Sequence, residues 1–310
     1  MILDLLIIFV CIVVLWKGAT FLVEAASRIA RQLGMSELVI GLTVVAIGTS
    51  APEFGVTVLA ALNGRADISI GNVVGSNIFN LGFILGGLAL LRGITTTKTM
   101  VYRDGVILIL ATLVLGLFLA DLELSRLEGI LMLAGLISYV GYLFFKREMP
   151  DEEEIPEGEY HWTDVPRLIG GIIMVILAGH FLVESASELA RLFGLSEWVI
   201  GVTIVAFGTS APEIATSGIA LLKGKHGISA GNLIGSDLFN LLGVLGLAAL
   251  IQPMALGSGA YGSILLLIGM VIGVVIMMRT GWRLSRWEGG LLVLVNVIRW
   301  GIDLSGGTLQ

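Results

Sequence analysis

The sequence predicts an all-α integral membrane protein with ten transmembrane helices, arranged as two inverted five-helix repeats in which helices 2 and 7 are broken. Three observations support this fold class. The 310-residue chain is 56% hydrophobic and only 14% charged, with a mean hydropathy of +0.98. Such a composition is too apolar for a soluble domain and is typical of a multi-span membrane protein. The other two observations are a regular succession of apolar segments and a set of motifs that recurs 160 residues later.

Apolar segments separated by polar breaks define the expected helices. A spanning helix needs about 20 mainly apolar residues. We expect helices at 2–27, 37–61, 68–91, 104–120, 127–145, 166–187, 197–221, 228–251, 260–278 and 287–303. The first segment carries Asp4 instead of a basic start, so we interpret it as a spanning helix and not as a cleaved signal. Cys11 is the only cysteine, which excludes an intrachain disulfide.

The internal repeat indicates a gene duplication. Residues 48–53 read Gly-Thr-Ser-Ala-Pro-Glu, and residues 208–213 read the same. Residues 71–80 match 231–240 at the same offset. Because each half has five expected helices, the second half enters the membrane from the opposite side, which is the plan of many secondary transporters. We therefore divide the chain into a first repeat, an acidic linker and a second repeat, at 1–145, 146–165 and 166–310.

Lysine and arginine residues are distributed unevenly between the two sides of the predicted topology. One side holds Arg28, Arg31, Arg92, Lys98, Arg103, Lys146, Arg147, Arg167, Lys223, Lys225, Arg279, Arg283 and Arg286. The other holds Arg65, Arg126, Arg191 and Arg299, and Lys17 lies within the first helix. The positive-inside rule assigns the richer side to the cytoplasm. We therefore expect a multi-pass protein of the cell membrane with both termini outside and a cytoplasmic linker.

The repeated Gly-Thr-Ser-Ala-Pro-Glu motif places a proline and a glutamate inside an apolar helix. Proline cannot donate a backbone hydrogen bond and clashes with the preceding turn, so each helix must break at this motif. Irregular backbone at membrane depth is tolerated only where it is buried in protein or lines a wet cavity. Glu53 and Glu213 each cost about 3 kcal/mol at a helix centre, and such residues are usually functional. The alternative is a pair of protonated carboxyl groups that join helices.

The second repeated motif supplies amide and hydroxyl oxygens at a spacing of four, which places them on one helical face. Its members are Asn72, Ser76 and Asn80 in the first copy and Asn232, Ser236 and Asn240 in the second. Such oxygens suit hard cations, including Ca²⁺. For Ser76, Asn80, Ser236 and Asn240 we expect cation ligation. For Asn72 and Asn232 we expect hydrogen bonds between helices.

Several other polar residues have less specific interpretations. Asp237 stands where the first repeat has Asn77, and it is a possible additional member of the site. Three roles stay open for it: a third negative charge, a proton carrier, or part of an aqueous entry path. Glu24 precedes Arg28 by four residues, which predicts an ion pair within one helix. The three histidines, His161, His180 and His226, do not have metal-ligand spacing.

With these motifs in view, the chain resembles the cation/Ca²⁺ exchanger superfamily, and within it the prokaryotic Na⁺/Ca²⁺ exchangers. The resemblance covers nearly the whole chain. It implies that helices 1 and 6 act as gates that slide across a core of helices 2, 3, 7 and 8. It also implies a metal site formed by the side chains of Thr49, Ser50, Glu53, Ser76, Asn80, Thr209, Ser210, Glu213, Ser236 and Asn240, with the backbone carbonyls of Ala46 and Ala206.

Three residues bear on the coupling ion. Some relatives, including K⁺-dependent ones, carry aspartate where this chain has Asn240, which argues against K⁺ co-transport. The proton-coupled branch usually has glutamate where Gly75 and Gly235 stand here, which favours Na⁺ over H⁺.

The resulting expectation is a Na⁺/Ca²⁺ antiporter that works by alternating access, needs no cofactor, and has the lipid bilayer and the two ions as its partners. An H⁺/Ca²⁺ antiporter is the alternative. A more remote alternative is an intramembrane enzyme that uses Glu53 and Glu213 as paired acids, but the sequence has no nucleophile–base pair beside them. A channel is less compatible with inverted broken helices. The sequence shows no basic patch for nucleic acid and no evident protein partner.

Overall fold

A computed structural model describes residues 2–146, 159–194, 204, 206–256 and 260–304. It divides into two compact units, the first formed by residues 1–52 and 148–232 and the second by residues 53–147 and 233–310. Each unit contains segments from both sequence repeats. The division into repeats at 1–145 and 166–310 concerns descent and stays a prediction, and most of the predicted linker lies outside the described residues.

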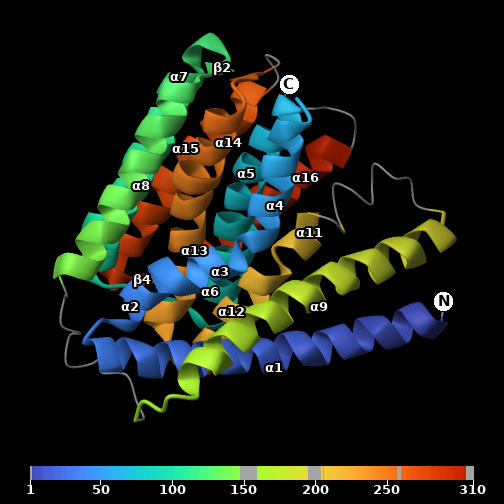
Figure 1. The fold of residues 1–310 in the computed structure, drawn as a ribbon, viewed down its shortest axis with the longest axis vertical. Coiled ribbons are helices and arrows are strands. Elements are labelled where there is room, and N and C mark those ends of the chain that lie inside the picture. Colours follow the sequence, from blue (N-terminus) through green and yellow to red (C-terminus); the bar gives the residue numbers. More distant parts are fainter. Residues whose placement is uncertain (1, 147–158, 195–203, 205, 257–259, 305–310) are drawn as a thin grey trace. The chain divides into compact units, whose positions relative to one another are not determined.

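The first unit is built around two long helices, α1 and α9, which lie side by side and run in opposite directions (Figure 1). Its elements are α1 (Ile2–Leu33), α2 (Glu37–Ile40), the π-helical turn η1 (Gly41–Val45), α3 (Ala46–Thr49), α9 (Asp164–Leu192), α11 (Ala206–Thr209), α12 (Ala211–Leu222) and the start of α13 (His226–Leu238).

Small residues bring α1 and α9 into close contact. A side-chain carbon added to Gly171 would lie 2.8 Å from the carbonyl oxygen of Gly18 and 2.8 Å from the amide nitrogen of Leu22. Even an alanine at this position would force the two backbones apart. Glycine therefore allows the close helix approach that is common in membrane proteins, where packing supplies much of the association energy.

The second unit contains most of α4 and the end of α13, together with the other helices and the four short strands found in the described residues. Its helices and helical turns are α4 (Ala51–Leu62), α5 (Ala66–Phe79), η2 (Asn80–Leu85), α6 (Gly86–Arg92), η3 (Met100–Gly105), α7 (Val106–Phe118), η4 (Leu119–Asp121), α8 (Arg126–Lys146), η7 (Phe239–Val244), α14 (Leu245–Ile251), α15 (Ala260–Arg279), η8 (Thr280–Trp282) and α16 (Arg286–Leu304). Its strands are β1 (Ile94–Thr95), β2 (Glu123–Leu124), β3 (Met254–Ala255) and β4 (Arg283–Leu284).

Contacts in the second unit recur at the repeat offset. Strand β1 pairs antiparallel with β4, and β3 pairs in the same way with β2, so each pair joins one strand from each sequence repeat. Two glycine contacts follow the same rule. Carbons added to Gly289 and Gly129 would lie 2.5 and 2.6 Å from the carbonyl oxygens of Gly86 and Gly246, respectively. The duplicated sequence thus forms duplicated helix contacts, α6 with α16 and α14 with α8.

Seven of the described helical segments are long and apolar enough to cross a membrane, and the pieces α2 to α4 would make an eighth if they count as one span. Two further predicted spans are not among them. The start of the segment at 197–221 lies outside the described residues, and α12 alone is too short. The last, α16, is a 19-residue helix with four charged residues. The structure therefore describes a multi-pass membrane protein, and the count of ten helices stays a prediction.

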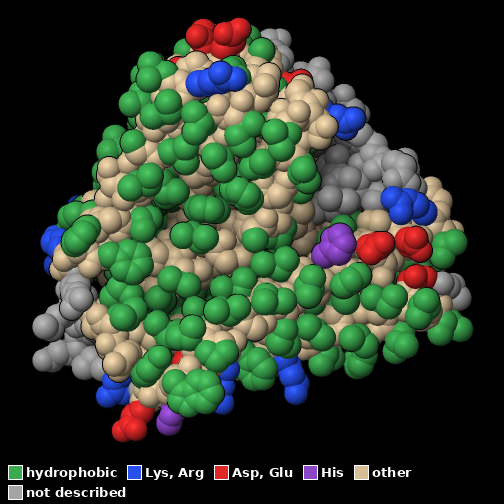
Figure 2. All heavy atoms as spheres, in the orientation of Figure 1, with side chains coloured by type: hydrophobic (Ala, Val, Ile, Leu, Met, Phe, Trp, Pro, Cys, Tyr) green, Lys and Arg blue, Asp and Glu red, His purple; other side chains and the backbone are tan. Residues whose placement is uncertain are grey.

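The surface of α1 and α9 is suited to lipid. Hydrophobic side chains cover most of these helices in the view of Figure 2, and charged side chains gather towards their ends. Exposed hydrophobic residues include Phe9 and Trp16 on α1 and Ile173 and Leu177 on α9. Exposed apolar surface of this extent is unfavourable in water and favourable in a bilayer.

Candidate cation site

Both copies of the Gly-Thr-Ser-Ala-Pro-Glu motif break a helix, as predicted. Helix α3 ends at Thr49 and α4 begins at Ala51, while α11 ends at Thr209 and α12 begins at Ala211. The proline is the second residue of each new helix, where its missing N–H is not needed. The glutamate is the third residue, in the first turn, where the helix dipole stabilises a carboxylate. Both glutamates, Glu53 and Glu213, are 1% exposed.

In the first unit, the two motif copies meet through their polar side chains. The Ser50 hydroxyl donates a 3.1 Å hydrogen bond to Oε1 of Glu213. The Thr49 hydroxyl lies 3.0 Å from Oδ1 of Asn232 and 3.3 Å from the carbonyl oxygen of Ala46. The Ala46 carbonyl also accepts from the backbone N–H of Ser50. The remaining predicted ligands of this unit are Thr209, Ser210 and the carbonyl of Ala206.

In the second unit, five predicted ligands are buried, namely Glu53, Ser76, Asn80, Ser236 and Asn240. The amide nitrogen of Asn80 donates a 3.0 Å hydrogen bond to Oδ1 of Asp237. The amide nitrogen of Asn240 donates a 3.2 Å hydrogen bond to Oδ1 of Asn77. The side-chain oxygens of Asn80 and Asn240 are buried and accept no hydrogen bond within the described residues. A buried amide oxygen without a donor is costly, so these two oxygens are suited to receive a cation.

Asn72 and Asn232 make hydrogen bonds between helices, which confirms the prediction for them. Asn72 on α5 donates to the Thr57 hydroxyl at 2.9 Å and to the Glu53 carbonyl at 3.3 Å, both on α4. Asn232 on α13 donates to the Ser217 hydroxyl on α12, also at 2.9 Å. These bonds hold each glutamate-bearing helix against the neighbouring helix.

The roles of Thr57, Ser217 and Asn77 in this network were not predicted from the sequence. Thr57 and Ser217 are hydroxyl partners at the repeat offset, so the alignment of the two repeats contained a signal for them. In the sequence, Asn77 is notable only as the counterpart of Asp237 in the first repeat. In the structure its side chain is fully buried and contacts Asn240, which the sequence alone does not reveal.

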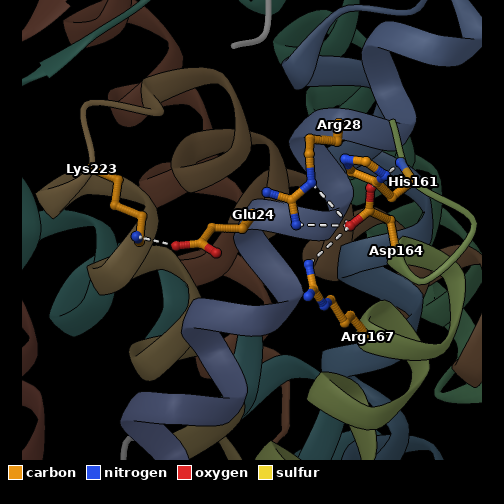
Figure 3. Close-up of polar contacts among 6 residues, drawn as sticks. All are labelled: Glu24, Arg28, His161, Asp164, Arg167 and Lys223. Atoms are coloured by element: carbon orange, nitrogen blue, oxygen red, sulfur yellow. Dashed lines mark hydrogen bonds and ion pairs between the residues drawn. The ribbon is translucent and has the colours of Figure 1, made fainter. Parts of the chain in front are cut away.

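Ion pairs lie at one end of the first unit (Figure 3). Asp164 is buried and accepts from Arg28 at 2.8 Å, from the backbone N–H of His161 at 2.8 Å, and lies 3.7 Å from Arg167. Glu24 pairs with Lys223 at 2.6 Å. The predicted ion pair between Glu24 and Arg28 is therefore wrong. Both side chains reach across to other parts of the unit, where packing places Lys223 beside Glu24 and Asp164 beside Arg28.

A second buried carboxylate completes this end of the unit. Glu37, at the start of α2, accepts a 2.5 Å hydrogen bond from the Ser27 hydroxyl on α1. It also lies 3.0 Å from the ammonium group of Lys225. The basic residues Arg28, Arg167, Lys223 and Lys225, which the sequence assigns to one side of the membrane, thus gather in one region of the first unit.

The chemistry of the candidate ligands is uniform. Carboxylate, amide, hydroxyl and carbonyl oxygens are hard donors, which Ca²⁺ binds in flexible sets of six to eight. Na⁺ is also a hard cation. The donor types therefore fit an alkali or alkaline-earth cation.

Comparisons with known proteins agree with this chemistry. The model of the sodium/calcium exchanger protein family matches residues 3–145 and 165–298. A protein named as an antiporter, CaxA of Alkalimonas amylolytica, is 37% identical over 92% of this chain and 93% of its own length. The sodium/calcium exchanger MaX1 of Methanosarcina acetivorans is 33% identical over 95% of this chain and 96% of its own length.

A solved structure of the sodium-calcium exchanger NCX_Mj, soaked with zero Na⁺ and Ca²⁺, has the same fold. Its TM-score is 0.85, with 28% sequence identity, 96% of this chain covered and 97% of that chain. The family match and these likenesses extend over almost the whole sequence. The chain therefore belongs to the sodium/calcium exchanger family.

Proposed function

We propose that this chain is a secondary active antiporter that exchanges Na⁺ for Ca²⁺ across the cell membrane by alternating access. The observation that carries the proposal is the pair of buried motif glutamates, each in the first turn of a broken helix, together with two buried amide oxygens that accept no hydrogen bond within the described residues. Family membership supports a transporter over an intramembrane enzyme with paired acids.

The proposed ligands are the oxygen atoms of the two repeated motifs. They are the side chains of Thr49, Ser50, Glu53, Ser76, Asn80, Thr209, Ser210, Glu213, Ser236 and Asn240, and the backbone carbonyls of Ala46 and Ala206. The charges of Glu53 and Glu213 balance one Ca²⁺. Neutral oxygens replace its lost hydration shell and also suit Na⁺.

Competition for shared carboxylates explains exchange. Ca²⁺ and Na⁺ that use the same two glutamates cannot occupy them fully at the same time. When the site opens to one side, the ion present there in excess displaces the other. Moving the site without a bound cation would carry the charges of the two glutamates through a low-dielectric region, which is costly and would suppress leak.

Na⁺ is the proposed coupling ion and H⁺ is the alternative. Gly75 and Gly235 stand where proton-coupled relatives usually have glutamate, so a second pair of titratable groups is missing from those positions. We further propose the inverted ten-helix topology, with both termini outside, on the basis of the lysine and arginine distribution. Labelling of cysteines introduced into the linker and near the C-terminus would test that orientation.

Ion flux in proteoliposomes tests the function. We expect uptake of labelled Ca²⁺ when Na⁺ is loaded inside and absent outside, and loss of uptake when both sides hold equal Na⁺. A pH gradient without a Na⁺ gradient should drive little uptake. Equal uptake driven by pH alone would replace this proposal by H⁺/Ca²⁺ exchange, and absence of Ca²⁺ flux under both gradients would contradict both.

A further inference from the structure

Two amide side chains among the proposed ligands are held by residues from the opposite sequence repeat. Asn80 donates its amide N–H to the carboxylate of Asp237, and Asn240 donates to the side-chain oxygen of Asn77. Positions 77 and 237 correspond in the repeat, as do positions 80 and 240. The same contact between the repeats therefore occurs twice. The acceptor is the carboxylate of Asp237 in one copy and the amide oxygen of Asn77 in the other.

These contacts form a directed series of hydrogen bonds. The Asn77 amide N–H donates at 3.0 Å to the backbone carbonyl of Asp237, which leaves the Asn77 side-chain oxygen to accept from Asn240. Asp237 thus accepts two hydrogen bonds. Its carboxylate accepts from the Asn80 amide, and its backbone carbonyl accepts from the Asn77 amide. The side-chain oxygen of Asn77 in turn accepts from the Asn240 amide. All four side chains are at most 1% exposed.

In these hydrogen bonds Asn80 and Asn240 act as donors through their N–H₂ groups. Each amide therefore has its oxygen left to contact another partner. A planar carboxamide presents its N–H₂ group on one side and its oxygen on the other. Oδ1 of Asp237 accepts from Asn80, so Asn80 turns its N–H₂ group towards Asp237. The oxygens of Asn80 and Asn240 then remain as acceptors, and they receive no hydrogen bond within the described residues.

We propose that Asp237 is a positioning residue for cation binding, whose carboxylate acts through Asn80. It keeps the Asn80 amide turned so that it presents its oxygen, and not its N–H₂ group, to the ion. Asn240 is oriented through Asn77 by the backbone carbonyl at position 237, which any residue there would supply. This inference rests on the proposed function of Asn80 and Asn240 as ligands. A wrongly turned amide would direct two N–H groups towards a cation, which is repulsive.

A double-mutant cycle with direct binding separates positioning from direct ligation. We would measure equilibrium binding of labelled Ca²⁺ to purified protein for Asp237→Ala, Asn80→Ala and the double variant. Loss of a hydrogen bond to a charged group should weaken binding about tenfold or more in Asp237→Ala. If Asp237 acts through Asn80, most of this factor disappears in the Asn80→Ala background.

Asp237→Asn is the matched conservative variant. Its side chain keeps an acceptor oxygen at the same place, so it should bind Ca²⁺ much better than Asp237→Ala and should remain folded even where the alanine variant does not. Asn77→Asp provides the converse control. A carboxylate there would face the Asp237 carbonyl in place of the N–H donor, so binding should weaken although a negative charge is added.

Three results would overturn the inference. They are wild-type Ca²⁺ affinity in Asp237→Ala, a full and undiminished effect of Asp237→Ala in the Asn80→Ala background, and equal losses in Asp237→Asn and Asp237→Ala. The second and third would indicate a direct ligand or a long-range charge effect. Failure of the proposed function looks different, because wild-type protein would then show no Na⁺-dependent Ca²⁺ uptake whatever the binding cycle gives.

Discussion

The buried polar clusters and the ion pairs at the end of the first unit both contain buried carboxylates, which accept from different kinds of donor. Asp164 and Glu37 accept from arginine or lysine side chains. Glu213 accepts from the hydroxyl of Ser50, and Asp237 accepts from the amide of Asn80. A hydroxyl or amide donor stabilises a carboxylate without neutralising its charge, whereas an ion pair does both.

This difference suggests that acidic residues have two roles in this chain, one in stability and one in cation binding. A carboxylate with a built-in cation contributes to the folded structure, because the protein itself supplies its counter-charge. The hydroxyl and amide donors to Glu213 and Asp237 add no positive charge, so these contacts are compatible with the binding of a cation. We therefore expect substitutions in the two regions to separate transport from stability.

The largest effect on transport is expected from Glu213→Gln and Glu53→Gln. Glutamine keeps the shape and one acceptor oxygen but removes the charge that offsets the desolvation of Ca²⁺. Each variant should lower Na⁺-driven Ca²⁺ uptake by about 100-fold or more, because a charge-assisted contact contributes about 3 kcal/mol or more at a buried site. Insertion and thermal unfolding should stay close to wild type.

Glu24→Gln is the matched control, since Glu24 is a glutamate of the same chain that pairs with Lys223 at a partly exposed position. It should transport at a rate near wild type. A wild-type rate in either motif variant would show that its carboxylate does not ligate the ion and would contradict the proposed site.

The largest effect on stability is expected from Asp164→Asn. The change removes a fully buried carboxylate from beside Arg28, whose side chain is 18% exposed. Breaking a buried pair typically costs 3–5 kcal/mol, and partial exposure of the arginine should reduce the loss to about 2 kcal/mol. Thermal unfolding in detergent should occur several degrees lower, with Ca²⁺ affinity unchanged. A large change in affinity without a change in unfolding temperature would contradict the assignment of this cluster to stability.

Arg167→Gln should have a smaller effect on the same cluster. Its guanidinium lies 3.7 Å from Asp164 and its side chain is 52% exposed. Exposed ion pairs contribute about 0–1 kcal/mol. The unfolding temperature should therefore fall less than in Asp164→Asn, and an equal fall would indicate that Arg167, and not Arg28, is the main partner.

The smallest effect is expected at Lys223 and Glu24. Their side chains are 36% and 40% exposed, so Lys223→Gln should change the free energy of unfolding by less than about 1 kcal/mol. Raised salt should remove even that difference. The charge-reversed pair, Glu24→Lys with Lys223→Glu, should unfold like wild type, and strong destabilisation of this double variant would contradict a simple surface pair.

The membrane class, the helix breaks and the family were predictable from the sequence, because each depends on composition or on short motifs. Composition identifies a chain that prefers lipid, and Pro52 and Pro212 break a helix whatever surrounds them. The roles of Asn72 and Asn232 in helix contacts were also predictable, since a buried amide at membrane depth must find a partner. The repeat offset made every such prediction available twice.

Pairing between distant residues was decided by tertiary structure. Spacing within a helix suggested that Arg28 joins Glu24, yet Arg28 joins Asp164, 136 residues away, because the packing of α1 against α9 brings that carboxylate into reach. In the same way, residue types alone left three roles open for Asp237. The direction in which it orients Asn80 and Asn77 follows from three-dimensional hydrogen-bond geometry, because a sequence specifies which donors and acceptors exist but only the folded chain determines which of them meet.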